Sequence, residues 1–279
     1  MIKSINLWSF PAGYTIGQCM DKALSAGFAA VEPNFAMTGE LGFATSDVDV
    51  LRIRRAAADR GMMLSSLSTG VYWNVPPTHD DPAVRRRAWE LLRRQIEVAA
   101  LLGTGTILVV PGLVGADFIP GSPVIPYDAA YDRALEFIAS AAPYAMACGI
   151  VIGIENVWNK FLLSPLEMRS FIDSCGSPFV KSYFDVGNVL VHGYPEHWIR
   201  ILGTRIARIH VKDFKMSVGN INGFTDLLAG DVNFPEVVKA LVEIGYDSFI
   251  TAEMNGYRHY SDQLIDNTSA AMDRILAMN

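Results

Sequence analysis

Short runs of apolar and β-branched residues recur along the chain, and amphipathic stretches separate them. Within those stretches apolar residues return at i, i+3 and i+4, as between Ala88 and Ala100, which is the period of a helix with one buried face. The short apolar runs indicate buried strands. The pattern predicts eight strands, at Ser4–Trp8, Ala29–Pro33, Met63–Leu67, Thr106–Val110, Ile150–Glu155, Val180–Asp185, Ile206–His210 and Phe249–Glu253.

Strands that alternate with helices indicate a parallel sheet, and eight such units predict an α/β fold in which a single (β/α)8 TIM barrel domain occupies residues 1–279. Glycines stand where helices should end before the next strand, for example Gly103 and Gly149. An open doubly wound sheet is the competing fold. It often has a glycine-rich phosphate loop after its first strand, and Phe10–Gly13 supplies none. The longest irregular stretches follow strands, where a barrel places its active-site loops: Ser68–Pro82, Pro111–Pro126 and Lys215–Asn233.

Composition narrows the function classes. Hydrophobic residues make up 51% of the 279 residues and the formal net charge is −6, which disfavours nucleic acid as the main partner. No apolar run reaches the length of a membrane span, and no long apolar segment follows a basic N-terminus. The three cysteines form no CxxC pair, which favours reduced thiols. We therefore expect a cytoplasmic protein that acts on a small molecule.

Four ionisable residues stand at the ends of the last four predicted strands. Glu155, Asp185, His210 and Glu253 are separated by 30, 25 and 43 residues, each about one strand–helix unit. In a barrel all four reach the same carboxyl-terminal rim. Any one of them could instead cap a helix or form an ion pair. Four on consecutive strands favour a shared site.

Three carboxylates that converge in a barrel repel one another, and a divalent cation relieves that repulsion. Three oxygen donors with one imidazole suit Mn²⁺, Mg²⁺ or Co²⁺ better than a structural zinc, which prefers thiolates. The sequence therefore predicts one divalent metal ion, with Mn²⁺ expected and Mg²⁺, Co²⁺ or Zn²⁺ as alternatives.

The segments around these residues resemble the metal-site motifs of the xylose-isomerase-like superfamily of sugar and sugar-phosphate isomerases and epimerases. The resemblance covers essentially the whole chain, and within the superfamily it is nearest to the L-ribulose/L-xylulose 5-phosphate 3-epimerase branch. The segments that carry it are Ile154–Asn156, Phe184–Asn188, His210–Lys215, Gly230–Phe234 and Ala252–Met254.

The resemblance implies a metal-dependent epimerase or isomerase of a ketose or ketose phosphate. Glu155 and Glu253 would bind the metal and act as the acid–base pair on opposite faces of one carbon, through an enediolate. Asp185 and His210 would serve only as ligands. A lyase of the inosose dehydratase or 3-dehydroshikimate dehydratase type shares the first step and is the alternative; a non-catalytic sugar-binding barrel is a third. Relatives suggest a homodimer or homotetramer.

Five further residues are candidate substrate contacts. Asn188 stands where free-sugar epimerases carry a sugar-contacting histidine. Lys212 alternates with His210 and is expected to face the rim or to lie in a solvated loop. Asp213 could orient a ligand or touch substrate, Glu32 ends the second strand and could bind a sugar hydroxyl or pair with a helix, and Trp8 could form an apolar wall against a sugar.

Overall fold

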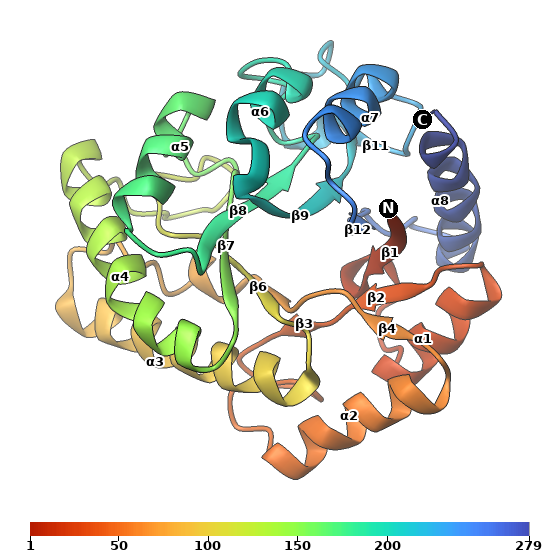
Figure 1. Ribbon diagram of the computed structural model, residues 1–279, viewed down its shortest axis with the longest axis horizontal. Coiled ribbons are helices and arrows are strands. Elements are labelled where there is room, and N and C mark those ends of the chain that lie inside the picture. Colours follow the sequence, from red (N-terminus) through yellow and green to blue (C-terminus); the bar gives the residue numbers. More distant parts are fainter. Residues whose placement is uncertain (279) are drawn as a thin grey trace.

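Residues 1–278 are described by a computed structural model. Eight parallel strands form one curled sheet, and helices surround it on the outside (Figure 1). All eight predicted strands correspond to observed ones, with ends that differ by at most three residues; the largest difference is at Met63–Leu67, where the strand ends at Leu64. The strands are β1 Ile2–Asn6, β2 Ala30–Glu32, β4 Met63–Leu64, β6 Thr106–Val109, β7 Val151–Glu155, β8 Val180–Asp185, β9 Ile206–Val211 and β12 Phe249–Ala252.

The first predicted strand, Ser4–Trp8, is wrong at its carboxyl end. The strand stops at Asn6, and Leu7–Ser9 forms a short 3-10 helix, η1. The Asn6 side chain accepts a hydrogen bond from the Trp8 N–H at 2.7 Å, which ends the strand and caps the turn. The apolar residues Leu7 and Trp8 therefore belong to a turn and not to the strand.

The two outer strands of the sheet, β4 and β6, come together and close it into a barrel. Its order is β4-β2-β1-β12-β9-β8-β7-β6. An isolated parallel bridge between Leu67 and Ile107 joins the segment after β4 to β6. The Leu67 N–H donates to Thr106 O, and the Leu108 N–H donates to Leu67 O, both at 3.0 Å. The TIM barrel prediction is thereby confirmed.

Eight helices cover the outside of the barrel in the described part of the chain. Gly103 follows α3 with φ +78°, a left-handed conformation that ends the helix without strain. Ser164 caps α5 by accepting the Glu167 N–H. The helices are α1 Ile16–Ser25, α2 Asp47–Asp59, α3 Pro82–Leu102, α4 Tyr127–Ala147, α5 Pro165–Ser174, α6 Pro195–Leu202, α7 Phe234–Glu243 and α8 Ser261–Leu276.

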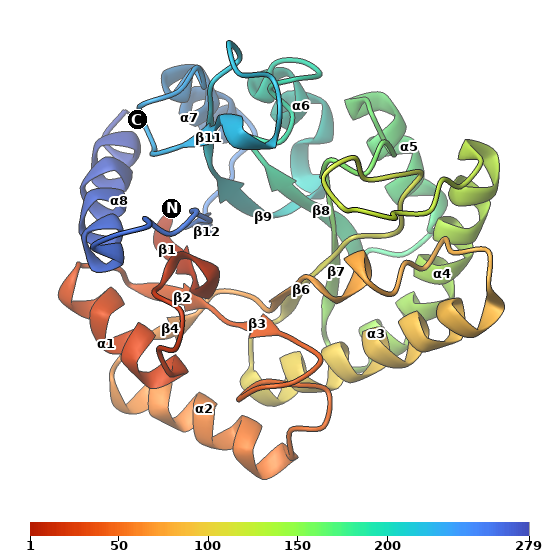
Figure 2. The same cartoon turned by 180° about the vertical axis from the view of Figure 1, so that it is seen from behind.

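Smaller elements build up the rim at the carboxyl ends of the strands, and Figure 2 views the barrel from that side. Four of them form the two-stranded sheets β3–β5 and β10–β11, and the 3-10 helix η4 lies between β10 and β11 in the chain. Their bounds, with those of the remaining 3-10 helices, are β3 Asn34–Phe35, β5 Ser68–Thr69, η2 Val71–Trp73, η3 Gly203–Arg205, β10 Asp213–Phe214, η4 Ile221–Gly223 and β11 Phe224–Thr225.

Apolar residues fill the layer between strands and helices, while the inside of the barrel is largely polar. Ser4, Asn6, Glu32, Ser65 and His210 are all fully buried. Buried polar groups of this kind persist only when they are hydrogen-bonded to one another. The inside of the barrel is therefore built to hold polar side chains in fixed positions.

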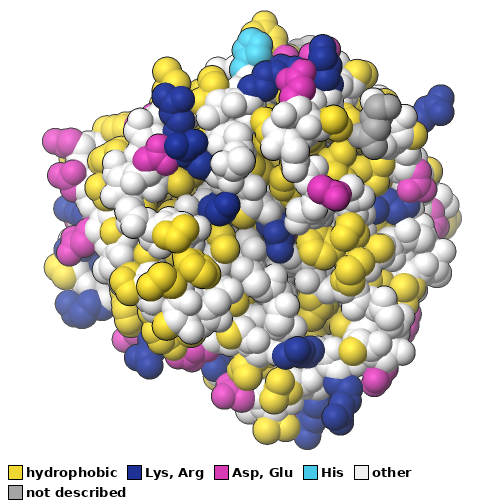
Figure 3. Space-filling view, in the orientation of Figure 1, with side chains coloured by type: hydrophobic (Ala, Val, Ile, Leu, Met, Phe, Trp, Pro, Cys, Tyr) yellow, Lys and Arg dark blue, Asp and Glu magenta, His cyan; other side chains and the backbone are white. Residues whose placement is uncertain are grey.

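Charged side chains gather around the perimeter of the face shown in Figure 3, over the surrounding helices, with both signs intermixed. Several form ion pairs between neighbouring helices, such as Arg60 with Asp21 and Arg200 with Glu243. Within residues 1–278, no helix is both long and apolar enough to span a bilayer.

Candidate active site

Glu155, Asp185, His210 and Glu253 converge at the carboxyl end of the barrel. They come from β7, β8, β9 and the residue after β12, and one ligand atom of each lies within 4.8 Å of the others. Asp185 and His210 are fully buried, and the side chain of Glu253 is 19% exposed. The four residues that the sequence grouped are thus brought to one point.

His210 lies at the centre of this cluster. Its Nδ1 is 2.9 Å from Glu253 Oε2, 3.6 Å from Glu155 Oε1 and 4.0 Å from Asp185 Oδ2. Neither His210 Nδ1 nor Asp185 Oδ2 has a hydrogen-bond partner, although both are buried. A buried polar atom without a partner is costly, and a cation between these atoms would satisfy both. The residues therefore fit one divalent ion with an N/O₃ donor set.

Glu32 holds the other side of the imidazole. Its Oε2 lies 2.7 Å from His210 Nε2 and accepts from Asn6 Nδ2 at 2.6 Å. Its Oε1 accepts from Ser66 Oγ at 2.6 Å and from the Tyr183 hydroxyl. This carboxylate holds a proton on Nε2, so Nδ1 is the ring nitrogen left to coordinate a metal once its own proton is released.

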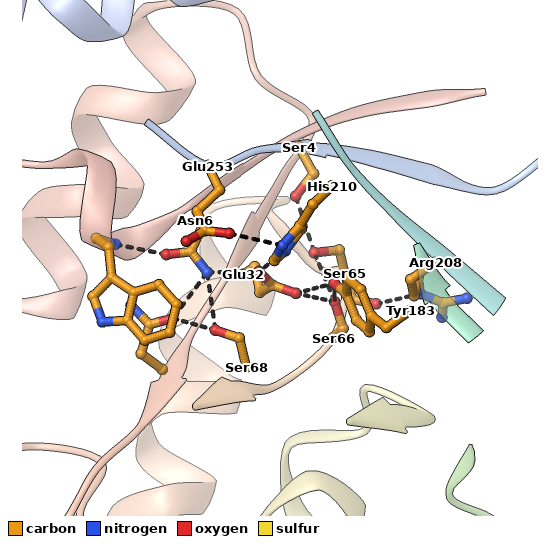
Figure 4. A network of polar contacts seen from close by, with 12 residues as sticks. Ser4, Asn6, Glu32, Ser65, Ser66, Ser68, Tyr183, Arg208, His210 and Glu253 are labelled. Atoms are coloured by element: carbon orange, nitrogen blue, oxygen red, sulfur yellow. Dashed lines mark hydrogen bonds and ion pairs between the residues drawn. The ribbon is translucent and has the colours of Figure 1, made fainter. Parts of the chain in front are cut away.

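Figure 4 shows this network running through the inside of the barrel, with Glu32 beneath His210 and Glu253. Tyr183 reaches across to Glu32 because Gly153 on the neighbouring strand leaves room: a Cβ at Gly153 would lie 3.0 Å from Tyr183 Cβ. At the far end, Arg208 Nε donates to Ser65 O at 2.9 Å. Glu32, predicted to contact a sugar hydroxyl or pair with a helix, is instead fully buried and positions His210.

Asn156 fixes the corner between β7 and β8. Its Nδ2 donates to Asp185 O at 2.8 Å, and its Oδ1 accepts the Asp185 N–H at 2.9 Å. Asn188 completes the corner, because its Nδ2 donates to Asn156 O and its N–H donates to Asp185 Oδ1. Asn188 therefore holds Asp185 through its N–H and its side-chain Nδ2, and its contact with a sugar stays a prediction.

Lys212 supplies a fixed positive charge to the cluster. Its Nζ lies 3.0 Å from Glu253 Oε2 and 3.3 Å from Asp185 Oδ2, and its side chain is 16% exposed. The loop after β8 packs closely on it, since a Cβ at Gly187 would lie 3.0 Å from Lys212 Cβ. Of the two sequence-based alternatives, the buried, rim-facing lysine is the one observed.

Asp213 and Trp8 lie outside the cluster. Asp213 is fully buried and accepts the N–H groups of Phe214, Gly230 and Val232, so it holds the long loop after β9. That arrangement leaves both of its oxygens bound to backbone, and the predicted contact with ligand or substrate does not fit it. Trp8 lies on the rim with 42% of its surface exposed.

The electrostatics separate the two candidate catalytic glutamates. Burial raises the pKa of Glu155 to about 7, and the nearby Glu253 acts in the same direction. Burial alone would also raise the pKa of Glu253, but Lys212 and His210 lower it to about 2. One carboxyl thus favours the protonated form and the other the ionised form, a division suited to an acid and a base.

The two pure ligand candidates respond to the same surroundings. Burial raises the pKa of Asp185. For His210 burial acts in the opposite sense, yet Glu32 and the cluster glutamates raise its pKa well above the usual value. Both shifts reflect the carboxylates that are buried together in this cluster.

A cavity of ≈ 440 Å³ opens over the cluster. We call it the Glu253 cavity. Lys212 and Glu253 form its floor, and Phe224, Asp226 and Tyr257 are among its walls. Its volume falls in the range of small-molecule sites.

Sequence reasoning did not assign roles to Asn6, Tyr183 and Asn156. Asn156 stands directly beside Glu155 in the recognised motif, so its position was a usable signal. Asn6 and Tyr183 act across the barrel, from β1 and β8 onto Glu32 of β2. Contacts of that kind depend on the tilt of the strands, and no regular spacing in the sequence reveals them.

Comparison with known proteins now assigns the family. Residues 20–277, most of the chain, match the family described as xylose isomerase-like TIM barrel. The chain belongs to this family. The fold, the eight-strand order and the convergence of the four ionisable residues agree with that membership.

Individual relatives are distant. A protein of Escherichia coli (strain K12) named "Putative L-ribulose-5-phosphate 3-epimerase SgbU" is 28% identical over 211 residues, which cover 71% of this chain and 68% of that protein. A solved D-psicose 3-epimerase, in the presence of D-fructose, superimposes with a TM-score of 0.82 at 20% identity over 100% of both chains. A solved L-ribulose 3-epimerase gives a TM-score of 0.80 at 19% identity over 99% of this chain and 94% of its own. The two structural likenesses show a shared fold.

Proposed function

We propose that this protein is a divalent-metal-dependent epimerase of a ketose or ketose phosphate. The observation that carries the proposal is the buried cluster of three carboxylates and His210, with a fixed lysine beside it and a cavity above it. The names of the relatives, which are ketose or ketose-phosphate 3-epimerases, support the same activity.

Glu155, Asp185, His210 and Glu253 would hold the metal. When bound, a divalent ion supplies Lewis-acid polarisation of a ketose carbonyl, which a carboxylate base needs to remove a proton from the adjacent carbon. The expected ion is Mn²⁺, with Mg²⁺, Co²⁺ or Zn²⁺ as alternatives. Elemental analysis after dialysis against Mn²⁺ should find about one ion per chain; three ions, or none, would contradict this assignment.

The protein groups divide the proton transfers between them. Glu253, held ionised by Lys212 and His210, removes the proton from one face of the carbon next to the carbonyl. Glu155, on the other side of the carbon, returns a proton to the opposite face. Lys212 lies next to Glu253 and stabilises the negative charge that develops on the substrate oxygens. In the reverse direction the two glutamates exchange roles.

Proton NMR of the products tests the proposal. The protein with added Mn²⁺ is incubated in D₂O with free ketoses and their phosphates, and Asp185→Asn serves as the inactive control. One deuterium at a carbon of inverted configuration is the expected result. A deoxy-keto product would instead identify the dehydratase-type lyase, because loss of a β-hydroxyl follows the same first proton transfer. Absence of turnover with every sugar would contradict both.

The remaining expectations concern assembly and location. We propose a homodimer or homotetramer that works in the cytoplasm with its three cysteines reduced. All three are free thiols in the structure, and burial raises the pKa of Cys19 and of Cys175 to about 12. Light scattering coupled to size-exclusion chromatography measures the assembly, and a monomer at micromolar concentration would contradict it.

A further inference from the structure

A second cavity of ≈ 530 Å³ lies on the rim beside the Glu253 cavity. We call it the Trp158 cavity. Ile221 of η4 lines both cavities. The Trp158 ring is 5.3 Å from the ring of Phe224, and Phe224 lies 5.4 Å beneath Lys212 Nζ. Trp158 is therefore linked to Lys212 of the cluster through a single ring, that of Phe224. A molecule whose reacting end lies over Glu253 could extend into the second cavity.

The walls of the Trp158 cavity come from four loops, those after β6, β7, β8 and β9. The loop after β7 is held in an unusual shape: Lys160 and Leu162 have φ of 55° and 54°, the left-handed region that favours glycine. Asn159 maintains it by donating to Gly112 O at 2.7 Å and by accepting the Phe161 N–H at 3.1 Å. A conformation that costs free energy and is held by buried contacts indicates a preformed wall.

The lining combines aromatic and aliphatic surface with amide groups. Phe118, Trp158 and Leu163 supply the apolar part, and Asn222 supplies an amide; the Asn220 amide is bonded within its own loop, to Val218 O and the Asn222 N–H. Phe118 packs edge-on against Trp73 at 5.2 Å, which fixes its ring. Apolar faces with a few polar groups among them suit a sugar ring, whose C–H faces lie on aromatic surface while its hydroxyls bond to amides.

Neither cavity offers an unpaired cation among the described residues that line it. Lys160 Nζ lies 2.7 Å from Asp117, and Lys212 is paired with Asp185 and Glu253. Burial lowers the pKa of His192, which keeps it neutral near pH 7. No arginine lines either cavity over residues 1–278. Phosphate binding sites in proteins use charge-assisted donors, most often from arginine or lysine, and each lysine that lines these cavities already faces a carboxylate, Lys160 in a solvent-exposed pair and Lys212 in a buried one.

We propose that the Trp158 cavity is a subsite for an uncharged glycosyl unit, so that the substrate is a ketose extended by a second sugar ring in place of a phosphate. This inference rests on the proposed function, because it places the reacting ketose over the cluster. The ketose end occupies the Glu253 cavity, the chain passes Ile221, and the second ring lies against Trp158 and Phe118.

Isothermal titration calorimetry and turnover measurements with three probes test this. The probes are D-fructose, D-fructose 6-phosphate and isomaltulose, a reducing disaccharide in which glucose is joined to O6 of fructose. With Mn²⁺-loaded protein we expect isomaltulose to bind about tenfold more tightly than fructose, the size of one or two aromatic contacts. Fructose 6-phosphate should bind no better than fructose. Tighter binding of the phosphate, or no advantage for isomaltulose, overturns the inference.

Variants separate this inference from the proposed activity. Leu163→Trp fills the cavity from a position that is 42% exposed, and Phe118→Ala removes part of its wall. Both should abolish the tenfold advantage of isomaltulose and leave fructose binding unchanged. Tyr194→Ala, on the rim but outside the lining, is the matched control and should keep the advantage. An advantage that survives Leu163→Trp contradicts the subsite.

The two proposals fail in different ways. Binding of isomaltulose that depends on Leu163 and Phe118, without turnover of any probe, retains the subsite and contradicts the epimerase. Turnover of fructose with no preference for the disaccharide retains the epimerase and contradicts the subsite.

Discussion

Replacement of Glu32 by glutamine removes the charge from the His210 support while its hydrogen bonds can remain. In the protein Glu32 accepts from four donors, two on each oxygen. The Ser66 and Tyr183 hydroxyls share one oxygen and can also act as acceptors. A glutamine NH₂ placed on that side finds acceptors, and its carbonyl still accepts from Asn6 and His210. Alanine, in contrast, removes both acceptor oxygens: His210 Nε2 loses its partner, while Ser66 and Tyr183 keep only each other and Asn6 Nδ2 keeps Asn34 and Ser68.

The magnitudes follow from this difference. A support of this kind is worth ~10- to 100-fold in metal affinity. We expect Glu32→Gln to lie at the lower end, near tenfold, because the ring is still held, and Glu32→Ala at the upper end. Glutamine should lower the free energy of unfolding by about 1.5–3 kcal/mol, the value of a hydrogen bond to a charged group. Alanine should cost ~3–5 kcal/mol, as when one partner of a buried ion pair is removed.

Competition titration with a fluorescent Mn²⁺ chelator gives the affinities, and urea unfolding of the metal-free proteins gives the stabilities. Glu90→Gln, a change of the same chemistry at an exposed ion pair with Arg87, is the control and should change neither. If both Glu32 variants bound Mn²⁺ as tightly as the unaltered protein, Glu32 would not orient a ligand. Equal losses in the two variants would show that charge acts alone.

Four further outcomes are expected. Burial raises the pKa of Glu155 to about 7 in the metal-free protein, and the surrounding carboxylates raise that of His210, so an incoming ion must displace a proton from each. Mn²⁺ affinity measured by titration should therefore weaken by more than tenfold per unit as the pH falls from 7, and a flat profile would refute this. Glu155→Gln and Glu253→Gln should each lose epimerisation while solvent deuterium still enters the substrate from one face, seen by NMR; inversion in either variant excludes two bases. Lys212→Met should bind Mn²⁺ more tightly, since a competing cation beside the cluster is removed, yet turn over ~10²-fold more slowly; weaker binding would contradict the electrostatic role. Asp213→Ala leaves three backbone N–H groups unpaired and should lower the free energy of unfolding by ~1–3 kcal/mol without changing metal content, measured by urea unfolding and elemental analysis.

The strands and the cluster could be predicted because each depends on local pattern. Glu155, Asp185, His210 and Glu253 end apolar runs, and the parallel order brings such ends together whatever the exact tilt of the strands. The family motifs strengthened the same grouping. The error in the first strand arose because apolar Leu7 and Trp8 continue the pattern while a cap from Asn6 ends it.

The supporting residues were harder, since they act over long separations in the sequence. Glu32 ends its strand as a ligand would, but it lies one layer deeper than Glu253, beneath His210. Only the stagger of the strands decides that depth. The position of Asp213 was predictable. Side chains alternate along an extended chain, so His210 and Lys212 share one face, and Asp213, three positions after His210, points away from it. Asn188 uses its N–H and its Nδ2 to hold its own corner of the site, which spacing alone does not reveal.

The division between strand-borne and loop-borne residues has a consequence for how this protein can change. The residues that hold the cluster lie on or directly after β2, β7, β8, β9 and β12, locked by buried hydrogen bonds inside the barrel. The cavity walls belong to rim loops whose insertion or exchange leaves that interior untouched. Laboratory evolution aimed at a new substrate should therefore accumulate its changes in the loops after β6, β7 and β9, and libraries restricted to those loops should retain a working metal centre in most of their folded members.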